Sequence, residues 1–281
     1  MAVNHTQSEF SEDATEACRR ILLELANIFS QFEDNMAIVG GWVPYFLIEQ
    51  RKEKHVGTLD VDLFFDCEKI GAESYETIEK ILEDNNYYRP RQGKGKFQWV
   101  KDVDINGKSI NVTVDLLCGE YEEQGKRNTL QEVQDVKLRT ARGSDLIFQS
   151  KNRCIKKSLS GKNIRGFGDT VTINVANGVA FLIMKGMAIG RGKTKDAYDI
   201  VYTIEHYEGG IERLVAEFQE DIEHGLVKEG LKKIRNKFGS ATHVGPNDVA
   251  DFRELEDPEE RELCFQRSFQ IVDELLSRLG F

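Results

Sequence analysis

Two aspartates lie two residues apart in an apolar stretch, and this spacing could support metal chemistry. Asp60 and Asp62 flank Val61 in the sequence TLDVDLFF. Side chains alternate along a β-strand, so both carboxylates should project from the same face. Neighbouring carboxylates repel each other unless a cation lies between them, and oxygen ligands of this type suit Mg²⁺ or Mn²⁺ better than zinc. The alternative is a solvated strand face that binds no ligand.

A pair of glycines precedes these aspartates and could provide a phosphate contact. Gly40-Gly41 follows the apolar residues 36–39 and precedes a segment that is predicted to be helical. Glycines between a strand and a helix let the backbone approach a phosphate closely and direct free N–H groups at it. A tight turn is the alternative interpretation. The combined order of glycines, helix and paired aspartates favours a phosphate and metal site.

A third aspartate occurs in the clearest strand pattern of the chain. Asn106-Gly107 separates two stretches of alternating apolar and polar residues, which predicts a β-hairpin. In the second arm, residues 108–117, Asp115 alternates with the apolar residues and so faces away from them. A half-buried carboxylate is costly unless it is paired or metal-bound, so Asp115 is expected to be a third metal ligand. A polar strand face is the alternative, although Asp is a poor strand former.

The order of these motifs resembles the signature of a known enzyme superfamily. Glycines at 40–41, a helix and TLDVD at 58–62 are similar to the polymerase-beta-type nucleotidyltransferases. The resemblance implies metal-dependent transfer of a nucleoside monophosphate from an NTP, such as ATP or GTP, to an acceptor hydroxyl. It implies that Asp60, Asp62 and Asp115 are catalytic and hold Mg²⁺ or Mn²⁺. The residues that it places against the nucleotide phosphates are Gly40, Gly41 and Thr58.

A second segment, FLIMKGMAIGRGKTKDAYDIVYTI at 181–204, extends this resemblance. It is similar to the helix-loop-helix of the AbiEii-type nucleotidyltransferases, the toxins of abortive-infection toxin–antitoxin systems. The similarity implies nucleotide binding by Lys185, Lys195, Asp196 and Asp199. Cations at a helix start can hold a triphosphate, and aspartates one turn apart can orient the lysines. The alternatives are a lysine that extends to solvent and aspartates that only anchor the loop.

Length and composition predict a globular chain with one large domain or two modest ones. The 281 residues are 40% hydrophobic, which is sufficient for a core. No apolar run approaches the length of a membrane span, and the N-terminus lacks the layout of a signal peptide, so a cytoplasmic location without membrane contact is expected. The five cysteines are scattered and show no C-x-x-C spacing, so neither a disulfide framework nor a zinc site is expected.

The formal charge of −10 argues against general coating of nucleic acid, but the cations are unevenly distributed. Residues 137–165 include nine Lys or Arg and a single acid, Asp145. The resemblance implies an RNA acceptor, such as a tRNA end, with this stretch as its binding surface, and a cognate antitoxin as a further partner. A solvated surface is the alternative for the stretch. The rival functions are a small-molecule nucleotidyltransferase, of the antibiotic type, and a non-enzymatic NTP-binding interaction protein.

These observations predict a mixed α+β fold in two domains. Residues 1–175 are expected to form a sheet with flanking helices, including an N-terminal helix over 11–30, and the resemblance implies that this sheet has the nucleotidyltransferase fold. Residues 176–281 are expected to form a helical domain that completes the nucleotide or substrate site.

Local patterns predict several further elements. Residues 146–148 are expected to form a short strand, 151–168 a basic loop and 169–175 a strand. His55 falls in a charged loop close to the aspartates, where a base or ligand role is conceivable but simple exposure is expected.

Overall fold

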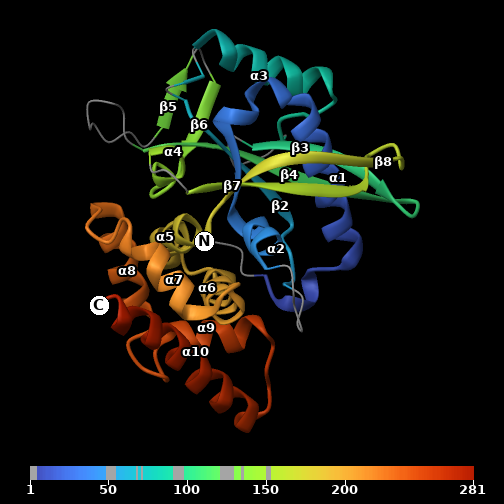
Figure 1. The fold of residues 1–281 in the computed structure, drawn as a ribbon. Coiled ribbons are helices and arrows are strands. Elements are labelled where there is room, and N and C mark those ends of the chain that lie inside the picture. Colours follow the sequence, from blue (N-terminus) through green and yellow to red (C-terminus); the bar gives the residue numbers. More distant parts are fainter. Residues whose placement is uncertain are drawn as a thin grey trace. The chain divides into compact units, whose positions relative to one another are not determined.

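The structure is a computed structural model with a mixed α+β architecture (Figure 1). The residues that it describes are 5–48, 55–67, 69–70, 72–90, 98–120, 130–133, 136–149 and 153–281. By its contacts the chain divides into two compact units, which we call the sheet unit and the helical unit. The sheet unit comprises Ser11–Val43 and Gly57–Asn177, and the helical unit comprises Met1–Phe10, Pro44–Val56 and Gly178–Phe281.

The sheet unit contains a mixed sheet with eight strands among the described residues. They are β1 (Met36–Val39), β2 (Asp60–Phe65), β3 (Gln98–Ile105), β4 (Lys108–Cys118), β5 (Leu130–Val133), β6 (Val136–Thr140), β7 (Cys154–Lys162) and β8 (Gly168–Ala176). The strand order is β5-β6-β4-β2-β1-β8-β7, and β3 pairs with β4. Strands β2 and β4 are parallel, as are β4 and β6 and also β1 and β8, whereas β1 and β2 are antiparallel.

The first helix, α1 (Glu12–Ile28), packs against this sheet through contacts with β3, β4, β7 and β8. It begins where the Ser11 side chain accepts a hydrogen bond from the backbone N–H of Ala14, a standard N-cap. Its apolar residues, including Ile21 and Leu25, are fully buried. The helix predicted over 11–30 is therefore confirmed. The sheet unit also contains α3 (Ala72–Asp84) and α4 (Leu146–Gln149).

The predicted hairpin is confirmed, and its turn follows from the residues that form it. Strands β3 and β4 pair from Gln98 opposite Asp115 to Ile105 opposite Lys108. Asn106 and Gly107 both have positive φ angles, 55° and 80°. A two-residue turn with this geometry matches the twist of the flanking strands and favours Asn-Gly.

Two local predictions were wrong. Residues 146–149 form the helix α4 rather than a strand. Half of the basic segment predicted as a loop, residues 151–168, is the strand β7, which pairs along its length with β8 in an antiparallel hairpin. Because β7 is at the end of the strand order and buries mainly Leu159, its sequence lacks the regular apolar alternation of a more buried strand. Residues 151–152 lie outside the described part of the chain.

The helical unit is built from helices that follow residue 177. They are α5 (Gly178–Ala188), α6 (Thr194–His206), α7 (Gly210–Gln219), α8 (Gly225–Lys237), α9 (Val244–Phe252) and α10 (Pro258–Arg278). The segment after the glycine pair, which is predicted to be helical, forms α2 (Val43–Leu47), and residues 49–54 lie outside the described part of the chain. Among the described residues, no helix combines the length and apolarity that a membrane crossing needs.

Helices α5 and α8 approach each other closely because glycines lie at the contact. A Cβ atom on Gly186 would lie 2.7 Å from the carbonyl oxygen of Gly230, and one on Gly230 would lie 2.9 Å from the side chain of Ile183. Larger residues would force the two helices apart. This contact sets the distance between the C-terminal part of α5 and the face of α8 that packs on it.

Candidate functional site

The sheet unit places the three predicted metal ligands on one face of adjacent strands. Asp62 on β2 is directly opposite Asp115 on β4, and Asp60 is opposite Thr113. Paired residues of neighbouring strands project from the same face, and residues two apart on a strand share it. Asp60 and Asp62 are half-buried, and Asp115 is 6% exposed. The prediction that Asp60 and Asp62 share a face is confirmed, and the structure places Asp115 on that face as well. The roles of the three carboxylates in catalysis and metal binding stay predictions.

The glycine pair lies beside Asp62. Gly40 has a φ angle of +67°, and a Cβ atom there would collide with the Asp62 carboxylate. Only glycine combines this backbone conformation with so close an approach. Gly40, Gly41 and Trp42 form a short 3₁₀ turn after β1, so the backbone at the end of β1 passes the carboxylate face at van der Waals range. Their contact with a phosphate stays a prediction.

Thr58 and α1 hold the segment that carries Asp60. The Thr58 hydroxyl donates a short hydrogen bond to Oδ1 of Asp60. Just before it, Gly57 lies so close to α1 that a Cβ atom there would be 3.1 Å from the Thr15 side chain. Burial, assisted by the negative charge of Asp60, raises the pKa of the Cys18 thiol on the same helix. The carboxylate at 60 is thus positioned by its own strand, by a neighbouring hydroxyl and by the packing of α1.

A cation that the sequence analysis did not single out lies beside the third aspartate. Arg139 of β6 places a guanidinium nitrogen 3.8 Å from Oδ2 of Asp115. It belongs to the basic stretch 137–165, but its position follows from the pairing of β6 with β4, where Arg139 is opposite Leu117. Charge counting alone could not separate this arginine from its eight basic neighbours, because the pairing joins residues far apart in the chain.

The positions of the three aspartates show whether they suit the predicted divalent ion. Within the described residues, no group of three or more His, Cys, Asp or Glu side chains is arranged to hold a metal ion. The donor set nevertheless suits Mg²⁺ or Mn²⁺, because Asp60, Asp62 and Asp115 offer oxygen ligands from one face. Gly40 lets the backbone approach the Asp62 carboxylate closely, which keeps this ligand next to the glycine turn. The residues fit such an ion in type and face.

The helical unit brings together the four other predicted nucleotide-binding residues. Lys185 of α5 forms ion pairs of 2.6 Å with Asp196 and 2.7 Å with Asp199, both on α6. Lys195 pairs with Asp199 at 2.7 Å. The two lysine side chains are 13% and 14% exposed, and the Asp199 side chain is fully buried. The aspartates therefore orient both lysines, as one predicted role requires, while contact with a triphosphate stays a prediction.

His55 joins this cluster, which corrects the expectation that it is exposed. Its side chain is fully buried, and Nε2 lies 2.9 Å from Oδ1 of Asp199. The imidazole also packs against the rings of Tyr198 and Tyr202, at centroid distances of 5.5 and 4.8 Å. A histidine within a charged segment has no local sequence signal for burial. Its position depends on α6, about 140 residues later in the chain.

The charges of this cluster perturb the protonation of its members. Burial lowers the pKa of His55 to about 4, which outweighs the upward effect of its hydrogen bond with Asp199. Burial alone would raise the pKa of Asp199, but the ion pairs with Lys185 and Lys195 hold it well below its usual range. Burial likewise opposes the charged form of Lys185, yet the two aspartates raise the pKa of its ammonium above the ordinary value. At neutral pH these shifts keep the Lys185 ammonium and the Asp199 carboxylate charged and the His55 imidazole neutral.

The basic stretch 137–165 contains cations in different environments. Arg142 forms a 2.5 Å ion pair with Glu120, and Arg153 is almost completely buried. Lys156, Lys162 and Arg165 are exposed on or next to the β7–β8 hairpin. Some of the positive charge in this stretch is therefore directed inward, and its role as an RNA surface stays a prediction.

Comparisons of the chain with models of known protein families, with curated proteins and with solved structures found no match.

Proposed function

We propose that this chain is a metal-dependent nucleotidyltransferase of the AbiEii type, which moves a nucleoside monophosphate from an NTP to an acceptor hydroxyl and releases pyrophosphate. The observation that supports it most directly is the pairing of Asp62 with Asp115 on parallel strands, with Asp60 on the same face. Like charges opposite each other destabilise a sheet. Their cost is explained if this face binds a cation together with a polyphosphate.

The residues of the sheet unit have distinct roles in this proposal. Asp60, Asp62 and Asp115 hold Mg²⁺ or Mn²⁺, which when bound stabilises charge on the phosphate oxygens and lowers the pKa of the attacking hydroxyl. The Thr58 hydroxyl keeps the Asp60 carboxylate in place. Gly40 lets the backbone approach the Asp62 carboxylate closely, and the backbone N–H groups of Gly40 and Gly41 contact a phosphate bound next to that carboxylate. In-line displacement needs little covalent help, so positioning and electrostatics supply the rate.

The helical unit supplies cations in this proposal. Lys185 and Lys195 bind phosphate oxygens of the NTP, and Asp196 and Asp199 hold the two ammonium groups in position. A fixed ammonium loses less side-chain entropy when it binds a ligand than a mobile one does. The favoured acceptor is RNA, such as a tRNA end, and a cognate antitoxin is the further expected partner of a toxin of this type.

The test is transfer of label from each α-labelled NTP, with Mg²⁺ or Mn²⁺, to total RNA or to small-molecule acceptors. The wild type should transfer label, whereas a double Asp60→Asn, Asp62→Asn variant should not. Asp34→Asn is the matched control, because this carboxylate is 78% exposed and its ion pair with Lys156 is 3.6 Å long. NTP binding that is equal in all variants and never leads to transfer would refute the enzymatic proposal.

Salt dependence separates the two acceptor classes. Binding of RNA to Lys156, Lys162 and Arg165 releases counterions, so affinity should fall steeply between low and moderate salt. If label is transferred to a small-molecule acceptor and the rate changes little between low and moderate salt, the antibiotic-type alternative is favoured.

A further inference from the structure

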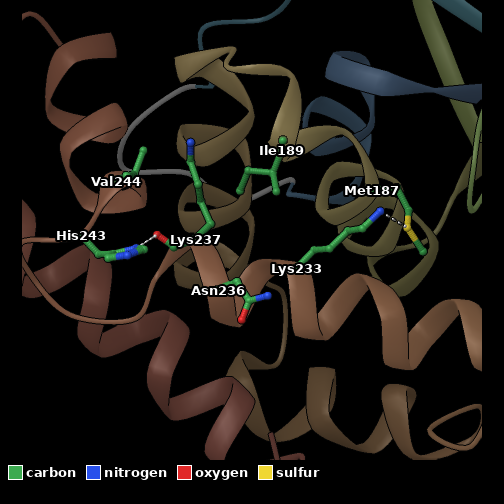
Figure 2. Close-up of a pocket in the computed structure, with 8 residues that line it drawn as sticks. Met187, Ile189, Lys233, Asn236, Lys237, His243 and Val244 are labelled. Atoms are coloured by element: carbon green, nitrogen blue, oxygen red, sulfur yellow. Dashed lines mark hydrogen bonds between the residues drawn. The ribbon is translucent and has the colours of Figure 1, made fainter.

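An open cavity in the helical unit uses none of the residues assigned above. Its volume is about 390 Å³, within the range of roughly 300–1,000 Å³ that is typical of ligand pockets. It lies among the C-terminal part of α5, the last turns of α8 and the start of α9, as Figure 2 shows. The close contact of α5 with α8 at Gly186 and Gly230 brings the first two of these elements together.

The wall of the cavity is largely apolar. Met187, in the last turn of α5, and Ile189, in the 3₁₀ turn that follows, are buried side chains, and Val244 is the first residue of α9. Val244 is 50% exposed, which makes it one of the few large apolar side chains in the described structure that solvent reaches to this extent. Because burial of apolar surface is favourable, an apolar group that covers this half-exposed valine would bind with a favourable free energy.

The polar side chains around this wall are cationic or neutral. Lys233 and Lys237 of α8 line the cavity together with His243, and the described lining residues include no Asp or Glu. Lys237 is 16% exposed and forms a 2.7 Å ion pair with Asp248. His243 donates from Nδ1 to the carbonyl oxygen of Lys237 at 3.0 Å, which fixes its ring. The lining therefore offers ammonium donors to a ligand, and the acids that balance their charge, Glu229 and Asp248, lie outside the lining.

Lys233 is the cation best placed to bind such a ligand. Its side chain is 39% exposed, and its ammonium lies 2.9 Å from a carboxylate oxygen of Glu229. The same ammonium lies 3.5 Å from the sulfur of Met187, the contact drawn in Figure 2. An ammonium has three donors, and a thioether is a weak acceptor. A carboxylate oxygen that replaced the sulfur as acceptor would form a stronger, charge-assisted bond.

We propose that this cavity binds a small amphipathic anion. The ligand places a compact apolar body against Met187, Ile189 and Val244 and a carboxylate next to Lys233. This site is additional to the proposed nucleotidyl transfer and does not depend on it, because it shares no residue with the carboxylate face or with the Lys185 cluster.

The test is a titration of the full-length chain, labelled with ¹³C at the methionine methyl groups, with octanoate. The Met187 methyl signal should shift saturably, whereas that of Met36, buried in the sheet unit, should stay unchanged. Octan-1-ol, which has the same chain without the charge, should bind at least about threefold more weakly. No saturable shift, or equal affinity for the alcohol, would overturn the proposal. A Met187 shift with ATP but not with octanoate would overturn it as well.

Two variants test the position of the carboxylate. Val244→Asp puts a negative charge beside the cavity at the first residue of α9, where an acid is favourable for the helix, so the fold should tolerate it. Octanoate affinity should fall about tenfold, with little change for octan-1-ol. Lys233→Met should also weaken octanoate binding severalfold, whereas Lys232→Met, an exposed lysine one position earlier, should not. Wild-type octanoate affinity in both Val244→Asp and Lys233→Met would refute the site.

Discussion

The Nε2 atom of His55 lies 2.9 Å from Oδ1 of Asp199, and both side chains are completely buried. This contact joins the segment before β2 in sequence to α6 and places a titratable ring beside two ammonium groups. Because the His55 ring titrates, the effect of this contact on the free energy of unfolding can be measured as a function of pH.

Stability of the helical unit should fall as pH decreases from about 6.5 to about 4. The pKa of His55 is lowered to about 4 from its ordinary 6.5 by burial, so the unfolded chain takes up the proton first. The loss should reach about 3 kcal/mol and level off below pH 4. Asp199, whose pKa is also held below its usual value, adds a further loss only below about 3.8.

Urea unfolding followed by circular dichroism at several pH values measures this loss. His55→Gln keeps a nitrogen donor at a comparable position without titrating, so its stability should depend less on pH in this window. The control is His224→Asn, which replaces an exposed histidine at the N-cap of α8 with another good capping residue and should keep the wild-type pH dependence. A wild-type slope in His55→Gln would show that His55 is not responsible.

Gly40→Ala should cost more stability than Gly107→Ala. Both glycines have positive φ angles, so each alanine carries a backbone cost of about 1–2 kcal/mol. Only at Gly40 would the new Cβ atom also meet the Asp62 carboxylate, since nothing lies within 4 Å of the corresponding position at Gly107. The clash should add about 1–3 kcal/mol. Equal free energies of unfolding for the two variants would mean that Gly40 is not needed for the close approach to Asp62.

Asp62→Asn should separate stability from metal binding. Without a divalent ion, removing one of two opposed carboxylates should leave stability unchanged or raise it by up to about 1 kcal/mol. With Mn²⁺, the wild type should gain thermal stability because the ion binds the folded state, and the variant should gain little. Asp34→Asn should respond to Mn²⁺ like the wild type. An equal response of Asp62→Asn would contradict the metal assignment.

Lys185→Met should strongly destabilise the helical unit. It removes the cation that Asp196 and Asp199 share, and breaking a buried ion pair costs about 3–5 kcal/mol. The double variant Lys185→Met, Asp196→Asn should recover part of this loss, because Lys195 still neutralises Asp199. Lys228→Met, in an exposed pair with Glu223, should cost no more than about 1 kcal/mol. The free energies come from denaturant unfolding, and a small effect at Lys185 would argue against a tightly coupled cluster.

The sequence by itself determined the elements whose signals are local. The Asn106-Gly107 turn and the alternation around it predicted the hairpin, because the turn conformation and strand pleat are properties of neighbouring residues. Helical spacing likewise predicted α1, and the spacing of Asp60 and Asp62 predicted their shared face.

The tertiary structure alone decided the relations between distant segments. The register that sets Asp62 opposite Asp115, the approach of Arg139 to that carboxylate and the burial of His55 against Asp199 all join residues far apart in sequence. Strand β7 is a similar case, since its pairing with β8 stabilises a segment whose own composition is that of a polar loop. Periodicity describes one element at a time, whereas these contacts depend on how several elements pack, which residue spacing alone does not determine.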